Sequence, residues 1–226
     1  MGAQAVPWSG ANTYRGAAAA LGAVILLLAL VPVLRGLGLG DAPFVQLALV
    51  AALEGALLAI VWALAVQPRN ATLATLGFRR SSPFSLAALP LLVLTASIGA
   101  ATMYALAVNL AGVSWHQPPA LPEALRGLSG ARGVVTAVLV VGWAPLAEET
   151  FFRGFLFQGL VASLGPVRAA AASALLFATG HGSVALLAPT SASGLLLTWL
   201  FARTRSLWPC VLAHALQNGI VLSVAR

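Results

Sequence analysis

The chain has 226 residues, of which 60% are hydrophobic and 8% are charged. A soluble domain carries about 25% charged residues, so this chain has too little polar surface to be a soluble enzyme or a disordered linker, and it is predicted to be an integral membrane protein. Its net charge of +7 comes from twelve arginines that lie mostly at the ends of apolar runs, which is typical of membrane orientation signals and argues against nucleic acid as a partner.

Seven apolar runs follow one another along the chain. A helix needs about 20 apolar residues to cross the hydrocarbon core of a bilayer. The runs cover residues 17–34, 44–66, 84–110, 134–164, 167–187, 194–202 and 207–225. Gly165-Pro166 separates the fourth run from the fifth, because proline interrupts the hydrogen bonds of a helix. The sequence therefore predicts an all-α, polytopic membrane helical bundle with about seven transmembrane helices, within a range of six to eight.

The arginines outside these runs predict how the bundle is oriented. Positive charge accumulates on the cytoplasmic side of a membrane. Seven crossings from a cytoplasmic N-terminus place four groups of arginines on that side: Arg15; Arg69, Arg79 and Arg80; Arg168; Arg203 and Arg205. Four others fall on the opposite side: Arg35, Arg126, Arg132 and Arg226. The balance favours a cytoplasmic N-terminus.

Ionisable residues inside the apolar runs are the candidates for chemistry, because a charge at mid-bilayer costs roughly 2.5–3.5 kcal/mol on insertion scales. In the fourth run, Glu149 and Arg153 are four residues apart on one helix and are predicted to form an ion pair. Glu148 points about 100° away from that pair, and desolvation would make it a better proton acceptor from water. Pro145 removes one helix hydrogen bond and can widen the site. The alternative is a buried ion pair with a spare acid near the interface.

Two histidines lie in the later runs. His181 stands between Gly180 and Gly182, which would let another backbone or a substrate approach closely. His214 and Asn218 share one helix face, where both can donate to a developing oxyanion, or the imidazole could bind a metal. Hydrogen bonding between helices is the alternative for each. Counted from the nearest arginines, both histidines lie roughly 14–20 Å deep, which predicts one shared site with the glutamates.

Several other peptidase classes are excluded by composition. The chain has no His-Glu-x-x-His zinc motif, and Gly38-Leu-Gly-Asp41 cannot serve an aspartate dyad because Asp41 is the only aspartate. That single aspartate lies far in sequence from any serine–histidine arrangement, and Ser193-Gly194 lacks the Gly-x-Ser-Gly form of rhomboids. Cys210 is the only cysteine, and burial in an apolar run disfavours its reactive thiolate.

Three motifs occur in order in the second half of the chain. They are Glu-Glu-x-x-x-Arg, Phe-x-x-x-His and His-x-x-x-Asn, formed by Glu148, Glu149 and Arg153, by Phe177 and His181, and by His214 and Asn218. In this order they resemble the CPBP family, which comprises type II CAAX prenyl proteases and bacteriocin-processing proteins and is also called the Abi family. The resemblance covers residues 131–225, and residues 1–130 match only as generic spans.

The resemblance implies an intramembrane, glutamate-dependent endopeptidase. It implies that Glu148 is the general base and that His181 orients or polarises the attacking water. It implies that His214 and Asn218 form the oxyanion hole. It gives Glu149 and Arg153 the task of bracing the helix or fixing the substrate.

The same resemblance sets the expected cofactors and partners. No cofactor is expected, and the alternative is a zinc ion held by His181, His214 and Glu148. The partners are the lipid bilayer and a membrane-associated protein or peptide substrate. A non-catalytic immunity or scaffold protein of the same fold is the alternative function.

The expected organisation is one integral membrane domain. Residues 1–130 supply N-terminal transmembrane helices and loops, and residues 131–226 supply the catalytic helical core. We expect a multi-pass protein of the inner (plasma) membrane whose active site opens toward the cytoplasmic side. Glu54 in the second run lies outside the motifs and is expected to pair with an arginine or to bond within the bundle.

Overall fold

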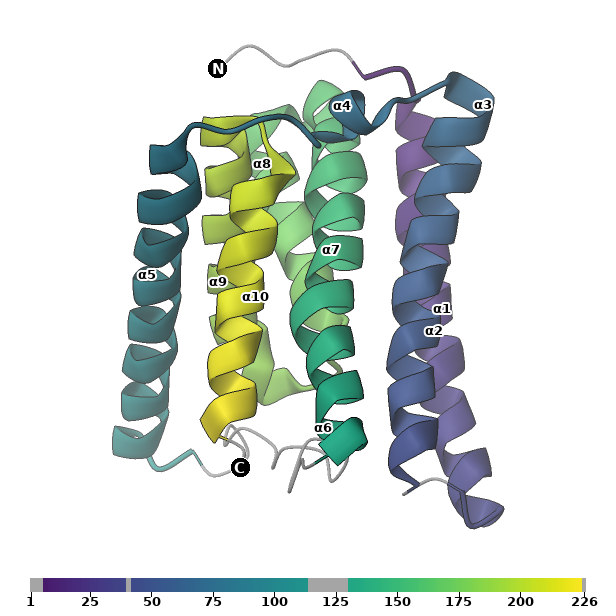
Figure 1. The fold of residues 1–226 in the computed structure, drawn as a ribbon, viewed down its shortest axis with the longest axis vertical. Coiled ribbons are helices and arrows are strands. Elements are labelled where there is room, and N and C mark those ends of the chain that lie inside the picture. The colour runs from purple at the N-terminus through teal and green to yellow at the C-terminus, as the bar shows by residue number, and fades with distance from the viewer. Residues whose placement is uncertain (1–5, 40–41, 114–129, 225–226) are drawn as a thin grey trace.

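The computed structural model describes residues 6–39, 42–113 and 130–224. These residues form helices and no strand (Figure 1), which confirms the predicted all-α bundle. The elements, with η for segments of π-helix, are α1 (Gly10–Gly36), α2 (Pro43–Val61), η1 (Trp62–Val66), α3 (Gln67–Arg69), α4 (Leu73–Leu76), α5 (Pro83–Leu110), α6 (Gly130–Ala137), η4 (Val138–Trp143), α7 (Ala144–Glu149), η5 (Thr150–Phe157), α8 (Gln158–Thr179), α9 (Val184–Thr204) and α10 (Leu207–Val224).

Six helical stretches of the described chain are long and apolar enough to cross a membrane, and one of them, Gly130–Thr179, is too long for a single crossing. Its 50 residues would extend about 75 Å as one straight helix, whereas the hydrocarbon core is about 30 Å thick. Gly165 breaks this stretch with a positive φ of 73°. Beyond the break, Ser173 Oγ donates to the carbonyl of Phe152 at 3.0 Å, so the chain runs back along itself. The predicted turn at Gly165-Pro166 is therefore confirmed, and the described residues traverse the bundle seven times.

The fifth and sixth predicted runs have different boundaries in the structure. Helix α8 ends at Thr179 and α9 begins at Val184, ten residues before the predicted start. The chain turns at Gly182, whose φ of 65° favours glycine. His181 was predicted to lie inside a span, and this prediction was wrong, because the residue lies in the short link between α8 and α9.

Many large apolar side chains of the bundle are exposed on its surface. In the most apolar windows of the candidate spans, only 6% to 33% of the residues are buried inside the protein. Leu26, Leu110 and Val167 are 69%, 80% and 80% exposed. Such a surface is stable in lipid, where helices also satisfy every backbone hydrogen bond internally. The structure therefore supports the predicted multi-pass membrane protein.

Three of the arginine-rich segments that were predicted to share one side of the membrane lie together. The start of α1, the α3–α4 segment and the link between α9 and α10 gather at one end of the bundle (Figure 1). Ser206 Oγ donates to the carbonyl of Arg79 at 2.7 Å, and Leu207 N donates to the carbonyl of Gly77 at 2.8 Å. These bonds join the 69–80 segment to the 203–205 segment, as the orientation argument requires.

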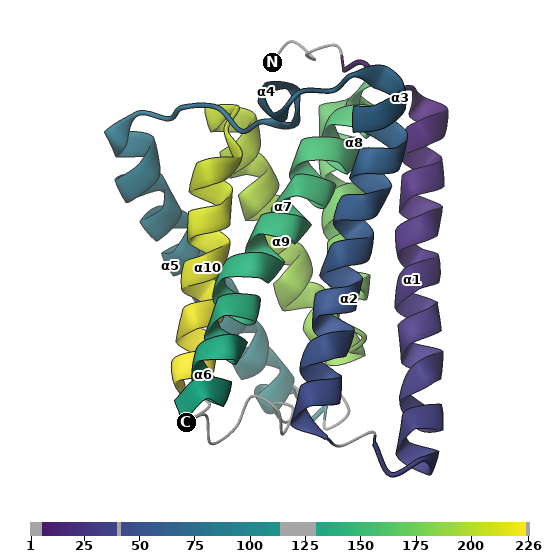
Figure 2. The ribbon, with the colours of Figure 1, turned by 45° about the vertical axis from the view of Figure 1, so that its right-hand side comes forward.

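Small residues allow the inner helices to approach closely. Helix α8 packs along α9, and a Cβ atom added at Gly194 would lie 3.1 Å from the Cα atom of Ala174. Helix α2 lies between α1 and α7 (Figure 2). Lipid tails are as apolar as the helix surfaces, so the hydrophobic effect does not drive helices together within a membrane. Close packing of this kind holds them together instead.

The α8–α9 contact predicts the effect of enlarging Gly194. We expect Gly194→Val to destabilise the protein by about 1–3 kcal/mol, because the added methyl groups force two backbones apart. Gly22→Val in α1 is the matched control, since nothing lies within 4 Å of a Cβ atom there. Thermal unfolding of both variants in the same detergent measures the difference, and equal midpoints would contradict the packing argument.

Candidate active site

The helix that carries the glutamates is widened on both sides of them. The α7 turn, Ala144–Glu149, lies between the π-helical segments η4 and η5, and such segments are frequent at functional sites. Ala144 N donates to the carbonyl of Leu139, and Pro145 has no N–H to offer. The carbonyl of Val140 is therefore left without a backbone donor, and Asn218 Nδ2 donates to it at 2.8 Å. Pro145 thus fixes Asn218 of α10 against the helix that carries the glutamates.

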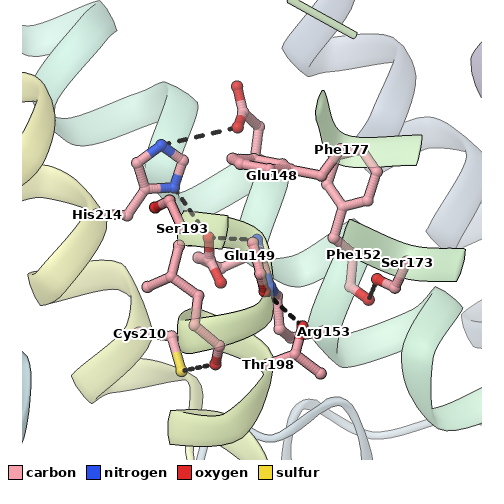
Figure 3. A network of polar contacts seen from close by, with 12 residues as sticks. Glu148, Glu149, Phe152, Arg153, Ser173, Phe177, Ser193, Thr198, Cys210 and His214 are labelled. Carbon is pink, nitrogen blue, oxygen red and sulfur yellow. Dashed lines mark hydrogen bonds and ion pairs between the residues drawn. The ribbon is translucent and has the colours of Figure 1, made fainter. Parts of the chain in front are cut away.

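Glu149 is the centre of a buried ionic network (Figure 3). Its Oε1 accepts from Arg153 Nη1 at 2.7 Å and lies 2.8 Å from His214 Nδ1. Arg153 Nη2 also donates to the carbonyl of Gly194 at 3.1 Å. The side chains of Glu149 and Arg153 are 0% exposed. The predicted ion pair between them is confirmed, and it extends to α9 and α10.

Phe177 connects the parts of the site. The guanidinium carbon of Arg153 lies 4.6 Å from the centroid of the Phe177 ring, within reach of a cation–π interaction. The same ring meets His181 and His214 edge-on, at centroid distances of 5.1 and 5.6 Å. Nδ1 of His181 donates to the carbonyl of Phe177 at 3.0 Å, because a carbonyl only accepts. The Nε2 atom of His181 is left as an acceptor.

A cavity of about 260 Å³ opens beside this network. It lies between α1, α2, the helix formed by η4, α7 and η5, α8 and α10. Most of its wall is apolar, and its polar lining consists of Glu54, Glu148, Thr179, His181 and Asn218. A largely apolar cavity with a few convergent polar groups is the usual form of a binding site.

Glu148 lines the cavity, and its ion-pair contact is longer than those of Glu149. Its side chain is 17% exposed, its Oε2 has no hydrogen-bond partner, and His214 Nε2 lies 3.8 Å from that oxygen. The adjacent Glu149 points into the protein and is paired. The structure therefore shows Glu149 in close ion pairs and Glu148 without one, and the role of Glu148 as a base stays a prediction.

The six predicted site residues occupy two layers. Glu148, His181 and Asn218 line the cavity. Glu149, Arg153 and His214 lie behind this layer, and they are 0%, 0% and 4% exposed. The structure thus brings all six residues into one neighbourhood, and their catalytic roles stay predictions.

Sequence reasoning missed the place of Glu54. This residue was expected to pair with an arginine or to bond within the bundle, and in the structure it lines the same cavity as Glu148. It is 3% exposed, and its Oε2 has no hydrogen-bond partner. The signal in the sequence was the presence of one acid inside an otherwise apolar run.

The described residues do not assemble a metal site. No three side chains of His, Cys, Asp or Glu in residues 6–39, 42–113 and 130–224 are grouped so that they could hold an ion. The described side chains are therefore not grouped as the alternative zinc site at His181, His214 and Glu148 would require.

Comparison with known proteins identifies the segment that carries the motifs. Residues 130–220 match the family described as "Type II CAAX prenyl endopeptidase Rce1-like". This Rce1-like segment begins where α6 begins, and it contains all six predicted site residues.

One curated relative matches a smaller part of the chain. The Bacillus subtilis (strain 168) protein called "Putative membrane peptidase YdiL" is 30% identical over 78 residues, which are 34% of this chain and 32% of that protein. The match thus spans about a third of that relative's length. No solved structure matches the chain. The Rce1-like segment is the part of this chain that the family match covers, and α1 and α2 add walls to its cavity.

Proposed function

We propose that the chain is an intramembrane endopeptidase that hydrolyses a peptide bond of a membrane-associated protein or peptide. The observation that carries the proposal is the contrast between two adjacent acids. Glu149 is buried in an ion pair, and Glu148 directs an oxygen without a hydrogen-bond partner toward an apolar cavity. A carboxylate in that environment is suited to take a proton from water. The match of residues 130–220 to a family named for endopeptidases supports the same activity.

The first chemical step is proton transfer from water to Glu148. The water oxygen then forms a bond to the carbonyl carbon of the substrate, and the carbonyl oxygen becomes an oxyanion. When the C–N bond breaks, the proton held by Glu148 moves to the nitrogen of the leaving amine. The carboxylate is restored, and one water molecule has been consumed for one peptide bond.

The groups available to stabilise the oxyanion lie on α10. Asn218 uses one N–H on the carbonyl of Val140, and its second N–H is available to a substrate. His214 donates Nδ1–H to Glu149, so its Nε2 donates to an oxyanion when the ring carries a second proton. Two donors in a site that excludes bulk water give the electrostatic stabilisation that acyl transfer requires.

His181 is proposed to help to hold the attacking water. Its Nε2 is the acceptor nitrogen, and its ring lines the same cavity as Glu148. A water that donates one hydrogen to Glu148 and the other to His181 would have its oxygen lone pairs directed at the substrate. In the α8–α9 link, His181 lies on the wall of the cavity that Glu148 also lines.

The proposed setting is the inner (plasma) membrane, with the site reached from the cytoplasmic side. The arginine-rich end supports this orientation, because α10 starts there and His214 is the eighth residue of that helix. The substrate is proposed to be held in or on the bilayer. The family description supports prenylated CAAX peptides as the first probe.

A comparison of membrane proteomes tests the proposal. Cells that carry the wild-type chain or Glu148→Gln are expected to differ in peptide termini, with at least one terminus absent from the variant. Mapping of new N- and C-termini by mass spectrometry measures this difference and identifies the substrate. Equal amounts of both chains in the membrane fraction are the control.

The opposite result is expected if the chain is a non-catalytic scaffold or immunity protein of the same fold. If no terminus is lost and Glu148→Gln still supports the cellular phenotype, hydrolysis is not the function of the chain. In that case the cavity would serve binding alone.

A further inference from the structure

The cavity contains a second acid that the three motifs do not include. Glu54 lies on α2, outside the Rce1-like segment, and it lines the same cavity as Glu148. The two carboxyl groups interact directly. The Oε2 atoms of both residues have no hydrogen-bond partner in the described protein. Two acids from different helices therefore meet at the place where the proposed general base faces the substrate space.

The fold gains no evident stability from Glu54. A buried carboxyl group among apolar side chains costs free energy unless it is paired. The neighbour that Glu54 meets is another acid, and the nearby Arg153 is already bonded to Glu149 and to the carbonyl of Gly194. The cost is consistent with a functional role and not with a stabilising one.

The contact also has a chemical consequence for Glu148. Two carboxylates that line one low-dielectric cavity repel each other, so the pair is more stable when it holds one proton. The protonated group then donates a hydrogen bond to the ionised one. His214 Nε2, at 3.8 Å, is too far from Glu148 Oε2 to orient it by a hydrogen bond.

We propose that Glu54 is a positioning residue that holds the Glu148 carboxylate by donating a hydrogen bond from its protonated carboxyl group. The pair, and not Glu148 alone, then forms the acid–base unit of the site. This inference rests on the proposed endopeptidase function. It gives α2 a part in the reaction that residues 130–220 do not supply by themselves.

Two substitutions at Glu54 test whether this side chain positions Glu148 or only fills space in the cavity. Glu54→Leu removes the donor and is expected to lower kcat about 100-fold, since misplacement of a catalytic group by about 1 Å has effects of that order. KM should change by less than about threefold, because the substrate contacts remain. Glu54→Gln keeps an N–H donor of similar size and is expected to restore kcat to within about tenfold of wild type.

The measurement uses the full chain in proteoliposomes with an internally quenched, farnesylated CAAX peptide, or with the substrate found by terminus mapping. Gln46→Leu is the matched control on the same helix, because Gln46 does not line the cavity. It should leave kcat unchanged. Thermal unfolding should show Glu54→Leu at least as stable as wild type, since the substitution removes a buried polar group.

The outcomes distinguish this inference from the function on which it rests. Wild-type kcat in Glu54→Leu, or equal loss in Glu54→Leu and Glu54→Gln, overturns the positioning role while the peptidase stands. If the wild-type chain cleaves nothing, the proposed function fails. Infrared difference spectra then test separately whether Glu54 and Glu148 share a proton. A carboxylic-acid C=O band that is present in wild type and absent from Glu54→Gln supports the shared proton, and its absence from wild type overturns it.

Discussion

Glu148→Gln is expected to lower the rate of peptide hydrolysis by about 10²–10⁴-fold, the range that a positioned general base contributes. Glutamine has nearly the same shape as glutamate, but its amide cannot take a proton from water. The side chain of Glu148 is 17% exposed and forms no close ion pair, so the substitution should leave the fold intact. Rates in proteoliposomes and unfolding midpoints of the same preparations measure the two effects.

The neighbouring substitution is the matched control. Glu149→Gln makes the same chemical change one residue along, but it removes the charge that Arg153 and His214 contact at 2.7 and 2.8 Å. We expect this variant to lose stability as well as activity. Equal stability loss in both variants, or an active Glu148→Gln, would contradict the assignment of Glu148 as the base and of Glu149 as the structural partner.

Much of this division could be predicted from the sequence because it depends on helix periodicity. Residues four apart share a helix face, which predicted the pair of Glu149 with Arg153. The same periodicity turned Glu148 away from them. The turn at Gly165-Pro166 was equally visible, since it depends on local backbone chemistry. Apolar run length likewise predicted the helical bundle.

The parts that could not be predicted depend on contacts between distant segments. Glu54 is 94 residues away from Glu148 in the numbering, and no periodicity connects one helix with another. The start of α9 was hidden by its polar residues, because Ser193 is satisfied by Gln217 of α10 at 2.9 Å. The link that contains His181 was hidden by the apolar residues on either side of it. In each case a tertiary contact decided the outcome.

The buried network also explains why the cavity has a fixed shape. Arg153 joins three helices, because it bonds Glu149 on its own helix and Gly194 on α9, and Glu149 in turn contacts His214 on α10. A charge network in this position is costly to bury, but once formed it sets one arrangement of the helices. The acid at the cavity wall is therefore held by a rigid backbone, although Glu148 itself forms no ion pair as close as those of Glu149.

Arg153→Met is expected to destabilise the protein by about 3–5 kcal/mol, because removing one partner of a buried pair leaves the other charge uncompensated. Methionine keeps much of the length of the side chain and its packing on Phe177, so the loss reports the missing charge and donors. Denaturant unfolding of the wild type and the variant in the same detergent measures this loss in the free energy of unfolding. A loss of less than about 1 kcal/mol would show that the pair contributes little.

The double variant Arg153→Met/Glu149→Gln separates charge from packing. Glutamine at position 149 can still accept from His214 Nδ1, which lies 2.8 Å from Glu149 Oε1 in the wild type. The double variant should therefore be more stable than Arg153→Met alone, since no unpaired charge is left buried. If it is no more stable, the arginine acts chiefly through its bond to Gly194 and its stacking on Phe177. Hydrolysis should be lost in the double variant, because it lacks the Glu149 carboxylate that holds His214 Nδ1 at 2.8 Å.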